Sequence, residues 1–104
     1  MKIMAFVLLL LAVACLGGGR GTEVSYVPEE GFVPSKEVAI KIAVAVWEPI
    51  YGAEKIAAEE PYRATLADGV WTVEGSLPEG SKGGVALARI SRKDGRILRV
   101  IHGK

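Results

Sequence analysis

The side chains that most often perform chemistry are sparse in this 104-residue sequence. His102 is the only histidine and Cys15 the only cysteine, whereas an ordinary transition-metal site needs several nitrogen, sulfur or oxygen ligands. Carboxylate pairs can perform acid–base work. The candidates here fit solvated helix and loop positions more simply: Glu48, Glu54, Glu59, Glu60 and Glu74. His102 fits an ordinary strand end, so we expect no catalytic residue, no metal site and no cofactor.

A glycine-rich segment at residues 80–84, Gly-Ser-Lys-Gly-Gly, bears a faint likeness to a phosphate-binding loop. It lacks the Gly-Lys-Ser/Thr ending and precedes a predicted strand rather than a helix. The segment therefore predicts an exposed connection in which Gly83 and Gly84 lead into a strand.

Cys15 follows a stretch that has the features of an export signal. Residues 1–14 contain thirteen apolar residues and Lys2, and the stretch ends in Ala-Val-Ala. Such a run is shorter than the about 20 residues that cross a bilayer. A basic start, a short apolar run and a small-residue exit are typical of a secretory signal peptide.

Two processing routes fit the end of this leader. Ala12-Val13-Ala14 is an Ala-x-Ala site for ordinary cleavage, which would leave Cys15 as a free thiol. The same residues with Cys15 resemble the bacterial lipobox, in which the cysteine is lipidated. The absence of a second cysteine and the glycine-rich residues that follow favour a lipidated Cys15 on a flexible tether. In a diderm bacterium, Leu16 lacks the acidic inner-membrane retention signal, which favours the outer membrane.

Charge is segregated along the chain, although the formal net charge is only +1. Residues 15–79 carry five basic and eleven acidic residues, whereas residues 80–104 carry seven basic and one acidic residue. Acids on neighbouring elements could neutralise this basic end, or it could present a surface to an acidic protein or anionic lipid. Nucleic acid is disfavoured because no stacking aromatics accompany the basic strands. The candidate partner-binding residues are Arg89, Arg92, Arg96 and Arg99.

The elements that must position these residues begin with an amphipathic helix. Ser35 is a suitable N-cap, and apolar residues recur with helical spacing from Val38 to Ile50. Pro49 must end or kink this helix, and Gly52 is a plausible stop.

Asp68-Gly69 predicts a β-hairpin with a two-residue turn. That turn pairs Ala67 with Val70 and continues to Arg63 opposite Glu74. This register also places Thr65 opposite Thr72 on one face of the hairpin, and it places the apolar side chains together on the opposite face.

Lys93-Asp94-Gly95 predicts a second hairpin. A three-residue turn with left-handed Gly95 pairs Ile90 with Leu98 and sets Arg89 opposite Arg99. We prefer this register to a two-residue turn because it gathers one apolar face: Ala86, Ala88, Ile90, Leu98 and Val100. The like charges opposite each other are unfavourable, so an acidic partner or a nearby glutamate would relieve them.

These elements predict an α+β domain in which one amphipathic helix packs on a four-stranded antiparallel sheet. We expect Trp47, Ile50, Tyr62 and Trp71 to meet in its core. The predicted organisation is a signal peptide over residues 1–14, lipidated Cys15 with its tether over residues 15–34, and the domain over residues 35–104.

Several segments of this domain resemble a family of small bacterial immunity proteins with a nuclear transport factor 2-like (cystatin-like) fold. They are Trp-Glu-Pro-Ile-Tyr-Gly at residues 47–52, residues 69–78, Gly-Gly-Val at residues 83–85, and residues 90–104. The resemblance covers about residues 34–104 and implies a non-catalytic protein that binds and blocks a bacterial toxin. The resemblance implies a structural role, rather than a toxin-binding one, for the residues of these motifs: Trp47, Pro49, Gly52, Trp71, Gly83, Gly84, Asp94 and Gly95.

Two functional hypotheses follow. The first is an envelope-anchored immunity protein that uses an exposed sheet face or the basic hairpin to occlude a toxin. The second is a periplasmic lipoprotein whose small domain binds a small ligand or an envelope component, for which a sizeable closed pocket is expected.

Overall fold

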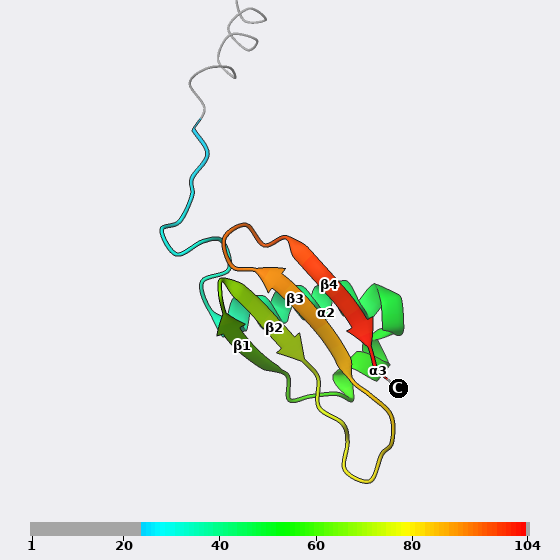
Figure 1. Ribbon diagram of the computed structural model, residues 1–104. Coiled ribbons are helices and arrows are strands. Elements are labelled where there is room, and N and C mark those ends of the chain that lie inside the picture. Colours follow the sequence, from blue (N-terminus) through cyan, green and yellow to red (C-terminus); the bar gives the residue numbers. More distant parts are fainter. Residues whose placement is uncertain (1–23, 104) are drawn as a thin grey trace, which may run out of the picture.

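The computed structural model describes residues 24–103, so the expected leader and Cys15 lie outside the described residues. Two helices precede four strands: α2 (Lys36–Tyr51), α3 (Ala53–Ala57), β1 (Arg63–Ala67), β2 (Val70–Glu74), β3 (Ala86–Ser91) and β4 (Ile97–His102). The strands form one antiparallel sheet in the order β1-β2-β3-β4 (Figure 1). The helix α2 packs against β1, β2 and β3, which confirms the predicted α+β architecture.

Local sequence explains where α2 begins and ends. The Ser35 hydroxyl accepts a hydrogen bond from the Val38 amide at 3.3 Å and so caps the first turn. Pro49 does not end the helix, which continues to Tyr51. Gly52 then turns the chain at a φ of 101°, and its amide donates to the Glu48 carbonyl. The short helix α3 follows at once.

The core lies between α2 and one face of the sheet. Ala39, Ala43 and Trp47 are fully buried at a spacing of four residues, which places them on one stripe of the helix. The expectation that Ile50 joins them is wrong, because Ile50 is 57% exposed. The stripe continues from Trp47 to the partly buried Tyr51, and Ile50 lies to the side of it. The sheet contributes Trp71, Val73, Ala86, Ala88 and Ile90.

The first hairpin has the predicted register in full, from Arg63 opposite Glu74 to Ala67 opposite Val70. Its turn residues Asp68 and Gly69 both have positive φ, as the tight turn requires.

The second hairpin has the predicted pairing of Arg89 with Arg99 and a left-handed Gly95 at a φ of 77°. The predicted pairing of Ile90 with Leu98 is wrong, since a bulge in β4 sets Ile97 opposite Ile90. Leu98 is the additional residue of this bulge, so it leaves the apolar face and is 45% exposed.

The folded part begins before the expected domain boundary near Pro34. Val33 is fully buried, its amide donates to the Arg92 carbonyl at 3.0 Å, and its carbonyl accepts from the Trp71 indole at 2.8 Å. The last residues of the predicted tether, 31–34, therefore belong to the domain. The reason is that the buried indole N–H of Trp71 needs an acceptor, which this segment supplies.

Candidate functional site

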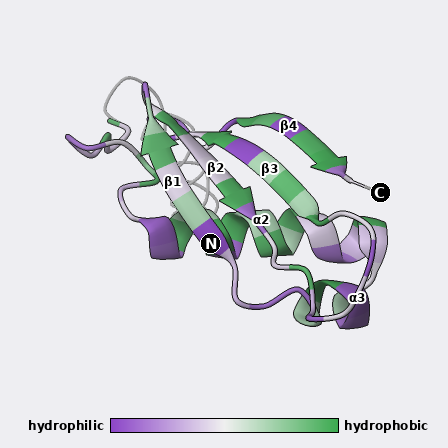
Figure 2. Cartoon of the chain, turned by 60° about the horizontal axis from the view of Figure 1, so that its bottom comes forward, coloured by the Kyte–Doolittle hydropathy of each residue, from purple (hydrophilic) through white to green (hydrophobic). Residues whose placement is uncertain are grey.

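The face of the sheet opposite α2, here called the outer face, is not covered by any element among the described residues (Figure 2). Strand register places Thr65, Thr72, Arg89 and Arg99 in one row across all four strands of this face. The adjacent row consists of Arg63, Glu74, Leu87 and Ile101. The outer face thus combines polar, apolar and basic side chains that the fold does not need for its core.

Arg89 and Arg99 lie directly opposite each other on β3 and β4, and both are exposed. Among residues 24–103, the carboxylates within 4.0 Å of a basic side chain are Glu74, 3.4 Å from Arg63 on the same face, and Glu59, 2.8 Å from His102. No carboxylate of the described residues therefore lies within 4.0 Å of either guanidinium. Both arginines border an open hollow of about 530 Å³, together with Asp68, Thr72 and Leu98.

The other two candidate arginines, Arg92 and Arg96, lie at the turn between β3 and β4. Arg92 is half-buried and borders a hollow that also includes Glu29 and Glu30. The Arg96 amide donates to the Asp94 carboxylate at 3.0 Å, and this bond lowers the pKa of Asp94. The four predicted arginines thus form two groups: Arg89 and Arg99 on the outer face, and Arg92 and Arg96 at the turn between β3 and β4.

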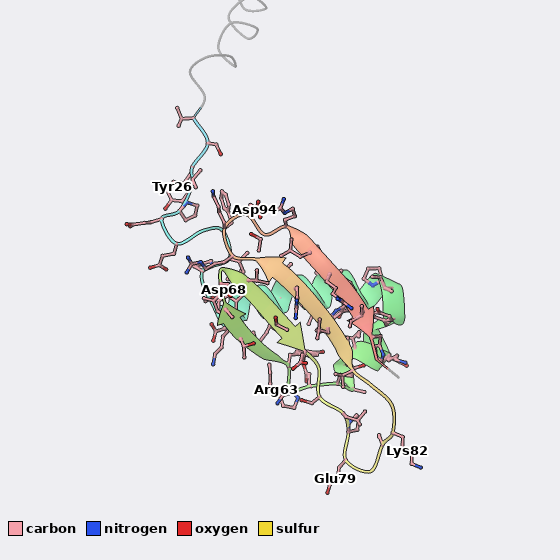
Figure 3. The ribbon with its side chains drawn as sticks, in the orientation of Figure 1. Tyr26, Arg63, Asp68, Glu79, Lys82 and Asp94 are labelled. Atoms are coloured by element: carbon pink, nitrogen blue, oxygen red, sulfur yellow. The ribbon has the colours of Figure 1, made fainter. Side chains whose placement is uncertain are left out.

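The turns β1–β2 and β3–β4 lie at one end of the sheet, where Figure 3 shows Asp68 and Asp94. The Arg92 amide joins the two turns by donating to the Gly69 carbonyl at 2.9 Å. The connection between β2 and β3 extends from the opposite end, with Glu79 and Lys82 near its tip (Figure 3). The glycine-rich segment at residues 80–84 is thus far along the sheet from the Asp68 and Asp94 turns.

The residues predicted from the family motifs lie in the core and at turns. Trp47 and Trp71 are buried, and Pro49 lies in the last turn of α2. Gly52, Gly83 and Gly95 have positive φ. Gly84 lies so close to Gly103 that a Cβ on Gly103 would be 3.2 Å from its Cα. Asp94 caps the turn next to Gly95.

A hydrogen bond between buried Glu59 and His102 is a contact that the sequence does not predict. The Glu59 carboxylate lies 2.8 Å from His102 Nε2 and accepts the Ala86 amide at 2.8 Å through its other oxygen. Glu59 is only 5% exposed, so its predicted solvated position is wrong. Gly75 makes room for it, since a Cβ there would overlap the carboxylate. One signal was present in the register: His102 shares the inward face of β4 with Val100, where a polar side chain needs a partner.

The geometry of this pair favours a structural role. Both carboxylate oxygens are engaged, His102 Nδ1 lies 2.9 Å from the Gly103 carbonyl, and the imidazole packs on Tyr51 with ring centroids 5.0 Å apart. The pair therefore ties the turn after α3 to the start of β3 and the end of β4. It also borders an open hollow of about 380 Å³ that includes Lys55 and Leu77.

Two further properties concern residues 24–103. No cluster of three or more histidine, cysteine, aspartate or glutamate side chains within this range is arranged to hold a metal ion. No helix within it combines the length and the hydropathy that crossing a membrane requires.

Comparison with known proteins gives relatives in Escherichia coli strain K12 and no matching solved structure. The chain is 36% identical to the uncharacterized protein YhhH over 73 residues, which cover 69% of this chain and 58% of that protein. It is 39% identical to the uncharacterized protein YbbC over 74 residues, which cover 69% of this chain and 60% of that protein. The chain thus spans less than two thirds of the length of either relative.

Residues 38–104 match the family described as NTF2 fold immunity protein. The match includes nearly all of α2, the whole of α3 and the whole sheet. It therefore also includes both groups of candidate arginines. By the extent of this match, the chain belongs to the NTF2 fold immunity protein family.

Proposed function

We propose that this protein is an exported, envelope-anchored immunity protein that neutralises a bacterial toxin by binding it through the outer face of the sheet. Membership of the immunity-protein family supports the general role. The observation that carries the proposed surface is the adjacent, exposed pair Arg89 and Arg99, which has no carboxylate within 4.0 Å among residues 24–103.

An acidic partner surface would remove an unfavourable interaction that the isolated domain retains. Like charges directly opposite on a sheet destabilise it by roughly 0.2–1 kcal/mol. Carboxylates placed over Arg89 and Arg99 would replace this repulsion with charge-assisted, bidentate hydrogen bonds. The neighbouring apolar side chains Leu98 and Ile101 are 45% and 39% exposed, and would be buried in the same contact. This combination fits a protein surface better than a small soluble anion.

The direct test is growth rescue on co-expression with the product of any toxin gene that lies beside this one. The double variant Arg89→Glu/Arg99→Glu should lose rescue. Its matched control is Lys36→Glu/Lys41→Glu, which makes the same change in charge on the exposed side of α2. Equal rescue by both variants would remove the outer face from the interface.

Anchoring in the envelope rests on the leader and on the lipobox-like residues that end in Cys15. Growth with a radioactive fatty acid should label the full chain and leave Cys15→Ser unlabelled. Equal labelling of the two proteins would contradict lipidation and favour ordinary cleavage. An anchored protein would meet its toxin in the envelope, so the toxin in the rescue experiment should be directed there.

The alternative function, binding of a small ligand or an envelope component, has one observation in its favour. The hollow beside Glu59 and His102, of about 380 Å³, falls within the range of ligand sites. It is open to solvent, whereas the alternative predicts an enclosed pocket. A gene neighbourhood without a toxin, together with unchanged growth in the rescue experiment, would favour this alternative.

A further inference from the structure

The strand β4 forms one edge of the sheet, and its backbone groups alternate between β3 and the open side. The Gly103 amide donates to the Val85 carbonyl at 3.1 Å, so the backbone of Gly103 faces β3. Counting back along the antiparallel ladder, Ile101 and Arg99 also face β3. The backbone groups of Val100 and His102 therefore point to the open edge.

The side chains along this edge are unusually apolar for an exposed strand. Ile97, Leu98 and Ile101 are 39%, 45% and 39% exposed. The opposite edge, β1, has one large apolar side chain of this kind, Leu66, at 42%. Proteins commonly protect such edges with charged side chains, proline or a bulge, and β4 has the bulge at Leu98 and one charged side chain, Arg99.

The charge at this edge indicates what could pair with it. A second copy of the chain paired along β4 would bring another Arg99 near Arg99 and Arg89. Its guanidinium group would increase the repulsion that already exists between these two side chains. A strand with acidic side chains on the outer-face side would instead place carboxylates beside these guanidinium groups. Because side chains alternate along a strand, the apolar side chains of this partner strand would lie on the other face, beside Val100 and the 39% exposed Ile97.

We propose that β4 binds an extended, acidic segment of the partner protein by strand addition. This inference rests on the proposed function, because it specifies how the toxin is held. Backbone hydrogen bonds to Val100 and His102 would supply the pairing, and Arg89 and Arg99 would select acidic side chains at alternate positions. The outer face and the β4 edge then form one continuous interface.

The first experiment uses a capped seven-residue peptide of alternating valine and glutamate as a probe, with the isotope-labelled protein observed by NMR. The peptide should slow hydrogen exchange of the Val100 amide by at least about 3-fold at millimolar concentration, and a peptide with glutamine in place of glutamate should do so less. Protection of the Leu66 amide instead, on β1, would contradict the choice of edge. No protection at either amide would contradict strand addition to this domain.

The second experiment uses the toxin rescue assay with a backbone change at each edge. Val100→Pro removes an amide that faces the open side, and Leu66→Pro removes the corresponding amide of β1. Val100→Ala controls for lost packing, and the thermal midpoint of each variant reports its folding. We expect Val100→Pro to lower affinity for the toxin at least about 10-fold more than Val100→Ala or Leu66→Pro does.

The outcomes separate the two proposals. If Arg89→Glu/Arg99→Glu loses rescue while folded Val100→Pro retains it, the outer face binds the toxin and strand addition is wrong. If neither change affects rescue, both proposals are wrong. If Val100→Pro does not fold, the protection of the Val100 amide in the peptide experiment decides.

Discussion

At the scale of single residues, the Glu59–His102 pair shows how a polar group is accommodated next to a small core. Glu59 is held by an amide of β3 and a side chain of β4, and Gly75 leaves the space that its carboxylate occupies. Removing a single partner of a buried pair leaves the other group without compensation.

Glu59→Ala should therefore lower the free energy of unfolding by about 1–3 kcal/mol, because the buried Ala86 amide loses its acceptor. The neighbouring Glu60 is exposed, so Glu60→Ala should change it by less than about 0.5 kcal/mol. Urea unfolding of both variants measures the difference. Similar midpoints for the two variants would show that the pair contributes little to stability.

Tyr62 predicts a pH dependence at the alkaline end. Burial, followed by the nearby Glu60, Glu48 and Glu59, raises the pKa of Tyr62 above its ordinary value of 10.0. The folded state thus favours the protonated phenol, which donates to the Ile56 carbonyl at 2.7 Å. The raised pKa of Tyr62 therefore contributes to the free energy of unfolding. This stabilisation is fully present below pH 10.0 and is lost as the pH rises through the higher pKa of the folded state.

Tyr62→Phe lacks this hydroxyl, so it should be less stable than the wild type at pH 7 by about 0.5–1.5 kcal/mol. The difference should narrow as the pH rises above the ordinary pKa of tyrosine. Chemical unfolding of both proteins from pH 7 to about pH 11 measures it. A difference that stays constant over this range would show that Tyr62 titrates alike in the folded and unfolded states.

At the scale of elements, alternation and turn residues predicted most of the sheet. The register from Arg63–Glu74 to Ala67–Val70 followed from Asp68-Gly69, because a two-residue turn fixes the pairs on both sides of it. The pairing of Ile90 is not predicted because Ile97 and Leu98 are both apolar, so the sequence does not show which of them lies opposite Ile90 and which is the additional residue of a bulge. Ile50 was misplaced because apolar spacing defines a wide stripe but not which of its borders faces the sheet.

The candidate site could be predicted only in part, for a similar reason. Sequence placed Arg89 opposite Arg99 because both positions follow from the turn at Gly95. It could not show that Arg92 borders the same hollow as Glu29 and Glu30, since those two residues lie in a segment with no periodic pattern. The contact between Glu59 and His102 joins residues 43 positions apart, which no local pattern reports.

Gly95 provides a test of the second turn. A side chain at its φ of 77° is strained, so Gly95→Ala should destabilise the domain by about 1–2 kcal/mol. Asparagine tolerates this conformation better than alanine does, so Gly95→Asn should lower the stability of the domain by less. Thermal unfolding measures the stability of both variants. An equal loss of stability would indicate crowding against Val33 rather than backbone strain.

At the scale of the whole molecule, one helix covers one face of a four-stranded sheet and leaves the other face for recognition. Most of the basic segment at residues 80–104 lies in β3, β4 and the turn between them, so the charge segregation of the sequence becomes a spatial one. Asp68 borders the same hollow as Arg89 and Arg99, but no carboxylate among residues 24–103 lies within 4.0 Å of this pair. The central claim is that this pair recognises the toxin.

Calorimetric titration of the purified toxin with the wild type, Arg89→Glu/Arg99→Glu and Lys36→Glu/Lys41→Glu tests that claim most directly. The outer-face variant should bind at least about 30-fold more weakly, or about 2 kcal/mol, with an unchanged thermal midpoint. The helix variant should bind like the wild type. Wild-type affinity in a folded Arg89→Glu/Arg99→Glu protein would contradict the account.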